Sequence, residues 1–132
     1  MKFTNEQKLI AAMLAEIHQK MGITDGVDSK LVASALWHRQ EWAIEWEHSF
    51  LLEQSPTPPH VKHVVDVLDM WSFLERAFKD LTPEELERVK AEAYPYDDLQ
   101  FPGWDGHDDN GYIGVARFLT ENMRRLSEFG GR

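Results

Sequence analysis

The feature that most constrains this chain is an apolar segment at residues 57–81, TPPHVKHVVDVLDMWSFLERAFKDL. Thr57 can cap a helix whose first turn tolerates the two prolines that follow, because their missing N–H groups would have no partner there. At about 100° per residue, the apolar side chains cover an arc of roughly 220°. They are Val61, Val64, Val65, Val67, Leu68, Met70, Trp71, Leu74 and Phe78. An arc this wide predicts a central helix, at about residues 58–80, with other helices packed on several sides of it.

The length and charge of the chain limit its class. A chain of 132 residues without cysteine is long enough to bury a core without disulfides, so we expect one domain over residues 1–132. The net charge is −9, and the basic residues are scattered, which argues against nucleic acid as a partner. No apolar run approaches the roughly 20 residues of a membrane span, and the first ten residues lack the pattern of a signal peptide. We therefore expect a cytoplasmic protein that is not in a membrane.

The first helix is marked by its cap. Thr4 and Gln7 have the spacing of a capping box, and Gly22 supplies a stop. Between them, apolar residues recur at helical spacing and are expected to face the core. They are Leu9, Ile10, Met13, Leu14, Ile17 and Met21.

A long second helix is expected from Ser29 to about Glu53, with two apolar stripes. One stripe contains Trp42, Trp46 and Phe50 among others, and the second consists of Trp37, Ile44 and Leu51. A small domain rarely needs two packing partners for one helix. The second stripe therefore predicts an interface with another subunit, so that Trp37, Ile44 and Leu51 are interface candidates.

The rest of the chain predicts two more helices and an ordered loop. Thr82 and Pro83 predict a helix over residues 83–93, and apolar spacing predicts another over residues 110–129. Between them, residues 94–111 hold prolines and glycines that exclude a long helix, together with aromatic residues that should fix the loop to the body. The predicted fold is all-α, with about five helices around the central one and an aromatic Pro/Gly-rich loop at residues 94–111.

Three segments together resemble the YfbU family of bacterial proteins: FTNEQKLI at 3–10, HVVDVLDMW at 63–71, and FPGWDG with YIGVARFL between 101 and 119. The last segment is the most specific, although His107 stands where the family pattern has Asn. The resemblance implies a helical, cytoplasmic bacterial protein and brings no catalytic residue with it. It directs attention to the polar members of the matching segments, Asp66, Asp69, Asp105, Tyr112 and Arg117.

Arg117 suggests a role for these residues that is structural. A carboxylate on the polar strip of the central helix, Asp66 or Asp69, could pair with its guanidinium and fix how two helices dock. A catalytic role for the same set is the alternative, and the sequence does not decide between them.

Several acidic and histidine residues raise the question of a metal. His38, Glu45 and His48 would share one face of the second helix, and Glu45 and His48 have the Glu-x-x-His spacing of di-iron proteins. No second such motif is present in the sequence, so a solvated face is favoured over a metal site. His60 and His63, spaced by three residues, lack a third ligand. Asp105 and Asp108 do not have the spacing of a calcium loop. No cofactor is expected.

These observations favour a self-associating interaction or adaptor protein without catalytic activity, which forms a homo-oligomer; a further, unidentified protein partner is left open. The alternative is a metal-dependent or acid/base enzyme, of hydrolase type, with a site near the Asp105 loop and the face of His38, Glu45 and His48. A weaker alternative is a sensor that holds a small ligand in an aromatic pocket. An exposed apolar patch would support the first, and convergent polar groups in a pocket would support the second.

Overall fold

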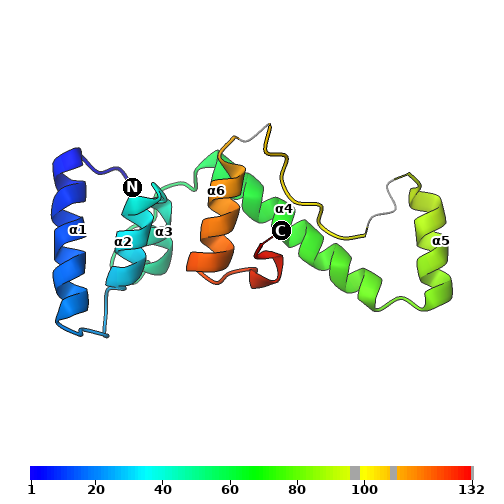
Figure 1. Ribbon diagram of the computed structural model, residues 1–132, viewed down its shortest axis with the longest axis horizontal. Coiled ribbons are helices and arrows are strands. Elements are labelled where there is room, and N and C mark those ends of the chain that lie inside the picture. The colour runs from blue at the N-terminus through cyan, green and yellow to red at the C-terminus, as the bar shows by residue number, and fades with distance from the viewer. Residues whose placement is uncertain (96–98, 108–109, 132) are drawn as a thin grey trace. The chain divides into compact units, whose positions relative to one another are not determined.

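The computed structural model describes residues 1–95, 99–107 and 110–131. Within these ranges every regular element is helical, which confirms the all-α class (Figure 1). The chain separates into two compact units, Met1–Pro59 and His60–Arg132. The single domain expected over residues 1–132 stays a prediction. No helix in the described part of the chain is both long and apolar enough to cross a membrane.

The first unit contains α1 (Asn5–Lys20), α2 (Ser29–Trp37) and α3 (Trp42–Glu47). Helix α1 begins as predicted, because Thr4 Oγ1 accepts a hydrogen bond from the Gln7 N–H at 3.1 Å and Gln7 Oε1 accepts one from the Thr4 N–H at 3.0 Å. It packs beside α2 through small side chains, and Ala15 is buried there. Next to it, His18 Nδ1 lies 2.9 Å from Ser29 Oγ and joins the two helices.

The continuous helix predicted from Ser29 to Glu53 is wrong, because the chain breaks at Arg39. Arg39 adopts a left-handed conformation with φ of 57°. The Gln40 N–H donates to the Ala35 carbonyl at 2.7 Å, and the Arg39 N–H donates to the Leu36 carbonyl at 3.4 Å. These two bonds form the Schellman motif that ends helices. Here a non-glycine residue occupies the left-handed position, so the usual glycine signal is missing from the sequence.

The break lets α3 turn all of its first residues inward. Trp42, Ala43, Ile44 and Glu45 are buried in succession, which a helix with one inward face cannot achieve. The Trp42 indole N–H donates to Gln40 Oε1 at 2.6 Å. Gln40, in the connection between α2 and α3, therefore provides the hydrogen-bond acceptor for this buried indole. The two stripes predicted on one long helix are therefore replaced by a short helix at the centre of the first unit.

The second unit begins with the predicted central helix, now α4 (Pro59–Lys79). Val61, Val64, Leu68 and Ser72 form its buried face at helical spacing. Other members of the predicted apolar arc stay exposed, with Met70 at 49% and Leu74 at 36%. The expectation that neighbours would cover α4 on several sides is thus only partly met. Helix α5 (Pro83–Ala93) has the predicted bounds, and Thr82 Oγ1 accepts from the Glu85 N–H at 3.2 Å.

The last predicted helix, over residues 110–129, is interrupted. Helix α6 (Tyr112–Arg117) passes into a π-helical turn, η1 (Phe118–Asn122), and a 3-10 turn follows at η2 (Ser127–Phe129). Between the turns, Arg124 and Leu126 have φ of 55° and 50°, so the chain reverses direction. The wider π turn brings Phe118, Leu119 and Thr120 inward in succession.

Candidate functional site

The described part of the loop between α5 and α6 is held to the second unit by an aromatic cluster. We define this cluster as the six rings of His63, Trp71, Phe101, Trp104, Tyr112 and Phe129. Phe101 is buried at its centre, with ring centroids 5.6 Å from Phe129 and 5.7 Å from Trp104, both edge to face. The predicted ordered loop is confirmed for residues 99–107. Residues 96–98 and 108–109, which include the calcium candidate Asp108, lie outside the described residues.

One side chain of α4 fixes the loop backbone beside this cluster. The carboxylate of Glu75 accepts a hydrogen bond from the Phe101 N–H at 2.8 Å. A second link ties the end of the chain to the same helix, because Ser72 Oγ lies 3.2 Å from Glu128 Oε1. No sequence motif marks Glu75 or Ser72. The sequence reasoning missed both, and only their place on the helix next to an aromatic segment could have suggested them.

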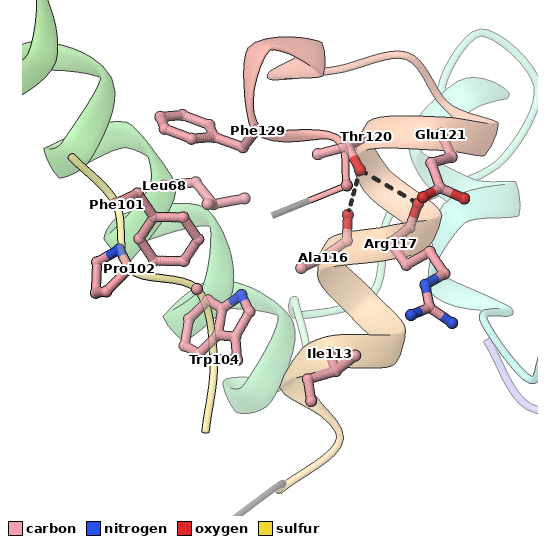
Figure 2. A pocket seen from close by; sticks show the side chains of 12 residues that line it. Leu68, Phe101, Pro102, Trp104, Ile113, Ala116, Arg117, Thr120, Glu121 and Phe129 are labelled. Carbon is pink, nitrogen blue, oxygen red and sulfur yellow. Dashed lines mark hydrogen bonds between the residues drawn. The ribbon is translucent and has the colours of Figure 1, made fainter. Parts of the chain in front are cut away.

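A partly enclosed cavity of about 350 Å³ lies between this cluster and α6 (Figure 2). Leu68, Phe101 and Trp104 line one side, and Ile113, Ala116 and Thr120 line the other. Arg117, Glu121 and Phe129 complete the lining together with backbone of the loop and the last residues. In Figure 2 the Trp104 ring stands across the cavity from Ile113, with its nitrogen on the edge nearer Leu68. The wall therefore combines apolar side chains with polar groups in similar measure.

The cavity contains an unused hydrogen-bond donor. The Trp104 indole nitrogen is buried and has no partner among the described residues. By contrast, the Thr120 hydroxyl donates to the Ala116 carbonyl at 2.9 Å and lies 3.4 Å from the Arg117 carbonyl (Figure 2). Both carbonyls lie where α6 passes into the π turn, so the Thr120 hydroxyl is used by the helix backbone. A buried donor without an acceptor is costly, and native proteins hold few of them.

The polar residues selected from the family resemblance do not converge on one point. Asp66 pairs with Lys62 on the same helix face, and Asp69 is exposed. Asp105 Oδ1 accepts from the His107 N–H at 2.9 Å, which closes an exposed turn. Tyr112 does join the aromatic cluster, with its ring 4.6 Å from that of His63.

Arg117 does not form the ion pair that the sequence suggested. Its side chain is exposed at the cavity edge, and no ion pair with Asp66 or Asp69 occurs among the described residues. A ring contact between Tyr112 of α6 and His63 of α4 joins the two helices instead. His63 is exposed, and its ring lies at the edge of the aromatic cluster, 6.0 Å from that of Trp104 and 4.6 Å from that of Tyr112.

The metal candidates of the first unit act as structural links. His48 is buried, its Nδ1 lies 2.7 Å from the Ile44 carbonyl, and its Nε2 accepts from the Asp28 N–H at 3.0 Å. His38 is exposed, with Nδ1 2.8 Å from the Ser34 carbonyl. Among the described residues, no three His, Asp or Glu side chains gather as metal ligands. Asp105 belongs to the other unit.

Glu45 is the charged centre of the first unit. Its carboxylate accepts from the Ser55 N–H at 2.8 Å and the Ser55 hydroxyl at 3.0 Å, and lies 3.0 Å from the Met1 amine. Desolvation by burial acts to raise its pKa. The hydrogen bonds from the amine and Ser55, with the charge of the amine, outweigh desolvation and lower the pKa of Glu45 below its usual value. Glu45 thus links helix α3 to Ser55, in the segment that follows the helix, and to Met1.

The interface candidates have different surroundings. Trp37 is 85% exposed and Leu51 is 65% exposed, so both are available to a partner. Ile44 is buried inside the first unit. As a result, the three residues do not form one stripe, although Trp37 and Leu51 stay candidates.

A larger apolar surface lies on α1, where the sequence predicted core. All six of its predicted core residues are more than half exposed: Leu9, Ile10, Met13, Leu14, Ile17 and Met21. We call this set the α1 face. The helix instead turns its alanines toward α2, as Ala15 shows. A groove of about 480 Å³ runs along the edge of the face, between Leu14 and Val32. Exposed apolar patches of this extent mark interaction sites in natural proteins.

Taken together, the helices, the loop packed by its aromatic residues and the exposed α1 face define a small all-α protein with an apolar helix face open to solvent. The chain belongs to the YfbU family: the model of the YfbU domain matches residues 1–132, the whole chain. No curated protein and no solved structure matches it.

Proposed function

We propose that this YfbU-family protein is a self-associating helical protein of the cytoplasm, without catalytic activity, which acts as an interaction or adaptor protein through its α1 face. The observation that supports this proposal is the exposure of six large apolar side chains on one helix, from 54% for Ile17 to 70% for Met21. Leaving such a face in water forgoes much of the free energy that its burial would supply. The helix is about 24 Å long, which suits the breadth of a standard interface of about 800 Å² per partner.

The charged residues at the two ends of the α1 face indicate what kind of partner binds to it. At about 100° per residue, Glu6 and Lys20 fall within the same arc as the apolar side chains. Glu6 lies in the first turn of α1 and Lys20 in the last, and neither is in an ion pair among the described residues. In an antiparallel pair of α1 helices centred on Met13, Glu6 of each copy would face Lys20 of the other. The face is therefore complementary to itself, and we infer that a second copy of this chain covers it.

The groove beside the face strengthens this inference. It is lined mainly by small or apolar residues of α1, α2 and the connection between them, including Ala11, Val27 and Val32. Side chains from a second α1 could enter it, as knobs enter holes in packed helices. Trp37 and Leu51 remain available for a further protein partner.

The first test is sedimentation-velocity ultracentrifugation of the whole chain over a range of concentrations. The unmodified protein should form dimers or larger even-numbered oligomers, and Met13→Lys should raise the dissociation constant at least tenfold because it places two charges at the centre of the pair. Leu51→Lys is the matched control, since it introduces the same charge at another exposed apolar site. A monomer at all concentrations, or dissociation caused by Leu51→Lys but not by Met13→Lys, would overturn the proposal.

Charge exchange tests the antiparallel arrangement itself. Glu6→Lys and Lys20→Glu should each weaken association, because each brings like charges together at both ends of the pair. The double variant should recover most of the affinity, because the opposite charges face each other again. If the double variant associates no better than the single variants, the α1 helices do not pair in this way.

A further inference from the structure

We infer that the cavity of the second unit binds a small, uncharged aromatic molecule that carries a carbonyl group, with the carbonyl oxygen accepting a hydrogen bond from the Trp104 indole N–H. This site is separate from the α1 face and does not depend on self-association. The inference rests on the shape of the cavity, the composition of its wall and the state of one buried donor.

The volume and wall of the cavity select the body of the ligand. About 350 Å³ is within the usual range for small-molecule sites, and the apolar part of the wall is concentrated on its aromatic side. Phe101, Trp104 and Phe129 present rings to the space, and Leu68 and Ile113 add aliphatic surface (Figure 2). A flat apolar ring fits such a wall, because it can pack edge to face against the aromatic side chains.

The buried donor selects the polar group. Trp104 Nε1 has no acceptor within the described chain although it is shielded from solvent. Indole nitrogen only donates, so a ligand must supply an acceptor to satisfy it. The neighbouring Thr120 hydroxyl already donates its hydrogen to the Ala116 carbonyl, so it is not a second donor for the ligand oxygen. A carbonyl oxygen on the ligand ring would therefore accept the hydrogen bond that no described residue accepts from Trp104.

The charges around the cavity disfavour a charged ligand. Arg117 and Glu121 both line it, so their charges oppose each other, and both residues are exposed. In Figure 2 their charged groups point away from the aromatic side of the cavity. A carboxylate next to Trp104 would lose its hydration and gain a single indole hydrogen bond, which is a poor exchange. A neutral carbonyl loses far less on entering.

Two probe molecules of nearly the same shape test the inference. Acetophenone carries a carbonyl oxygen, and α-methylstyrene has a methylene group in its place. The measurement is a titration of the ¹⁵N-labelled whole chain, followed by the indole N–H signals in ¹H–¹⁵N spectra. The Trp104 signal is assigned as the one that Trp104→Phe removes. We expect acetophenone to bind with a Kd on the order of a millimolar or tighter, to shift the Trp104 signal, and to bind about tenfold more tightly than α-methylstyrene.

Two variants make the result decisive. Trp104→Phe keeps an aromatic ring but removes the donor, so both probes should then bind equally, as followed by backbone signals of Ala116 and Ile113. Ala116→Leu fills the cavity and should abolish binding of both probes, while the Trp104 signal of the folded variant persists. Equal affinities of the unmodified protein for the two probes, no binding at millimolar concentration, or an unchanged preference in Trp104→Phe would each overturn the inference.

Discussion

The imidazole of His48 accepts a hydrogen bond from the backbone N–H of Asp28, at 3.0 Å, and so joins the end of α3 to the start of α2. Asp28 is also the N-cap of α2, where its carboxylate accepts from the Leu31 N–H at 3.0 Å. Asp28 thus caps α2 with its side chain, while its backbone N–H is bound by His48. This contact organises the first unit, and it gives a buried histidine a structural role.

Removing the imidazole should destabilise the first unit. His48→Ala leaves the Asp28 N–H without its partner, removes the side-chain contact to the Ile44 carbonyl and opens a cavity, so we expect the free energy of unfolding to fall by about 2–3 kcal/mol. Urea denaturation followed by circular dichroism measures this change. His38→Ala serves as the control at an exposed position and should cost less than about 0.5 kcal/mol. Equal effects of the two substitutions would contradict the role given to His48.

Acid should weaken the protein through Glu45. Because the folded state lowers the pKa of this carboxyl below its unfolded value, the ionised form contributes stability that is complete above the unfolded pKa, about 4.3. That contribution is lost as the pH falls through the lowered, folded-state pKa. The free energy of unfolding should therefore decrease from about pH 5 downward, and Glu45→Gln should flatten the curve. Glu53→Gln, at an exposed site, should leave the curve unchanged; if it flattens the curve equally, Glu45 is not responsible.

The left-handed residue between α2 and α3 can be improved. Arg39 has φ of 57°, which costs an ordinary residue about 1 kcal/mol and costs glycine little. Arg39→Gly should therefore raise the free energy of unfolding by a similar amount. Arg88→Gly, the same exchange within helix α5, should lower it by about 1 kcal/mol. Denaturation curves that show both variants destabilised alike would argue against the break at Arg39.

The aromatic cluster should account for much of the stability of the second unit. Phe101 is buried against three other aromatic rings, so Phe101→Ala should lower the free energy of unfolding by about 3–4 kcal/mol. Thermal denaturation monitored by tryptophan fluorescence reports on it, because Trp71 and Trp104 are its neighbours. Tyr94→Ala removes an aromatic ring of the same loop that is 77% exposed, and it should have little effect. A similar loss in both variants would contradict the cluster as described.

Replacing Arg117 should have little effect on stability. If Arg117 formed the ion pair suggested by the sequence, Arg117→Met would lower the melting temperature. Since the side chain is exposed and that pair is not formed, we now expect a change below about 0.5 kcal/mol in the free energy of unfolding. Differential scanning calorimetry distinguishes the two expectations. A fall of several degrees in the melting temperature would restore the ion pair as an explanation.

Local signals in the sequence predicted helices well wherever a few neighbouring residues decide the structure. The start of α5 follows from Thr82 and Pro83, and the start of α1 follows from Thr4 and Gln7. The break at Arg39 was not predictable in this way, because no glycine occupies the left-handed position. The π turn at Phe118 was missed for a related reason: three successive inward residues satisfy the core, and helical periodicity alone does not anticipate them.

Periodicity identified the apolar side of α1 but not what covers it. The same pattern of Leu9, Met13 and Ile17 describes a buried face and an exposed one, since spacing records only which side chains point together. The site of the second unit shows a similar limit. The sequence marked Phe101 and Trp104 as aromatic anchors, but the unsatisfied indole N–H depends on the positions of residues distant in the chain, such as Leu68 and Ala116.

The contact between α1 and α2 has a consequence for motion. Because α1 meets its neighbour through alanine and a few polar links, its inner side buries little area, and detaching it should require only a small part of the unfolding free energy. In a dissociated chain the backbone amides of α1 should exchange their hydrogens faster than those of α3. Covering the outer face with a second copy would reverse that order, so that the helix most loosely held in one chain becomes the most protected in two.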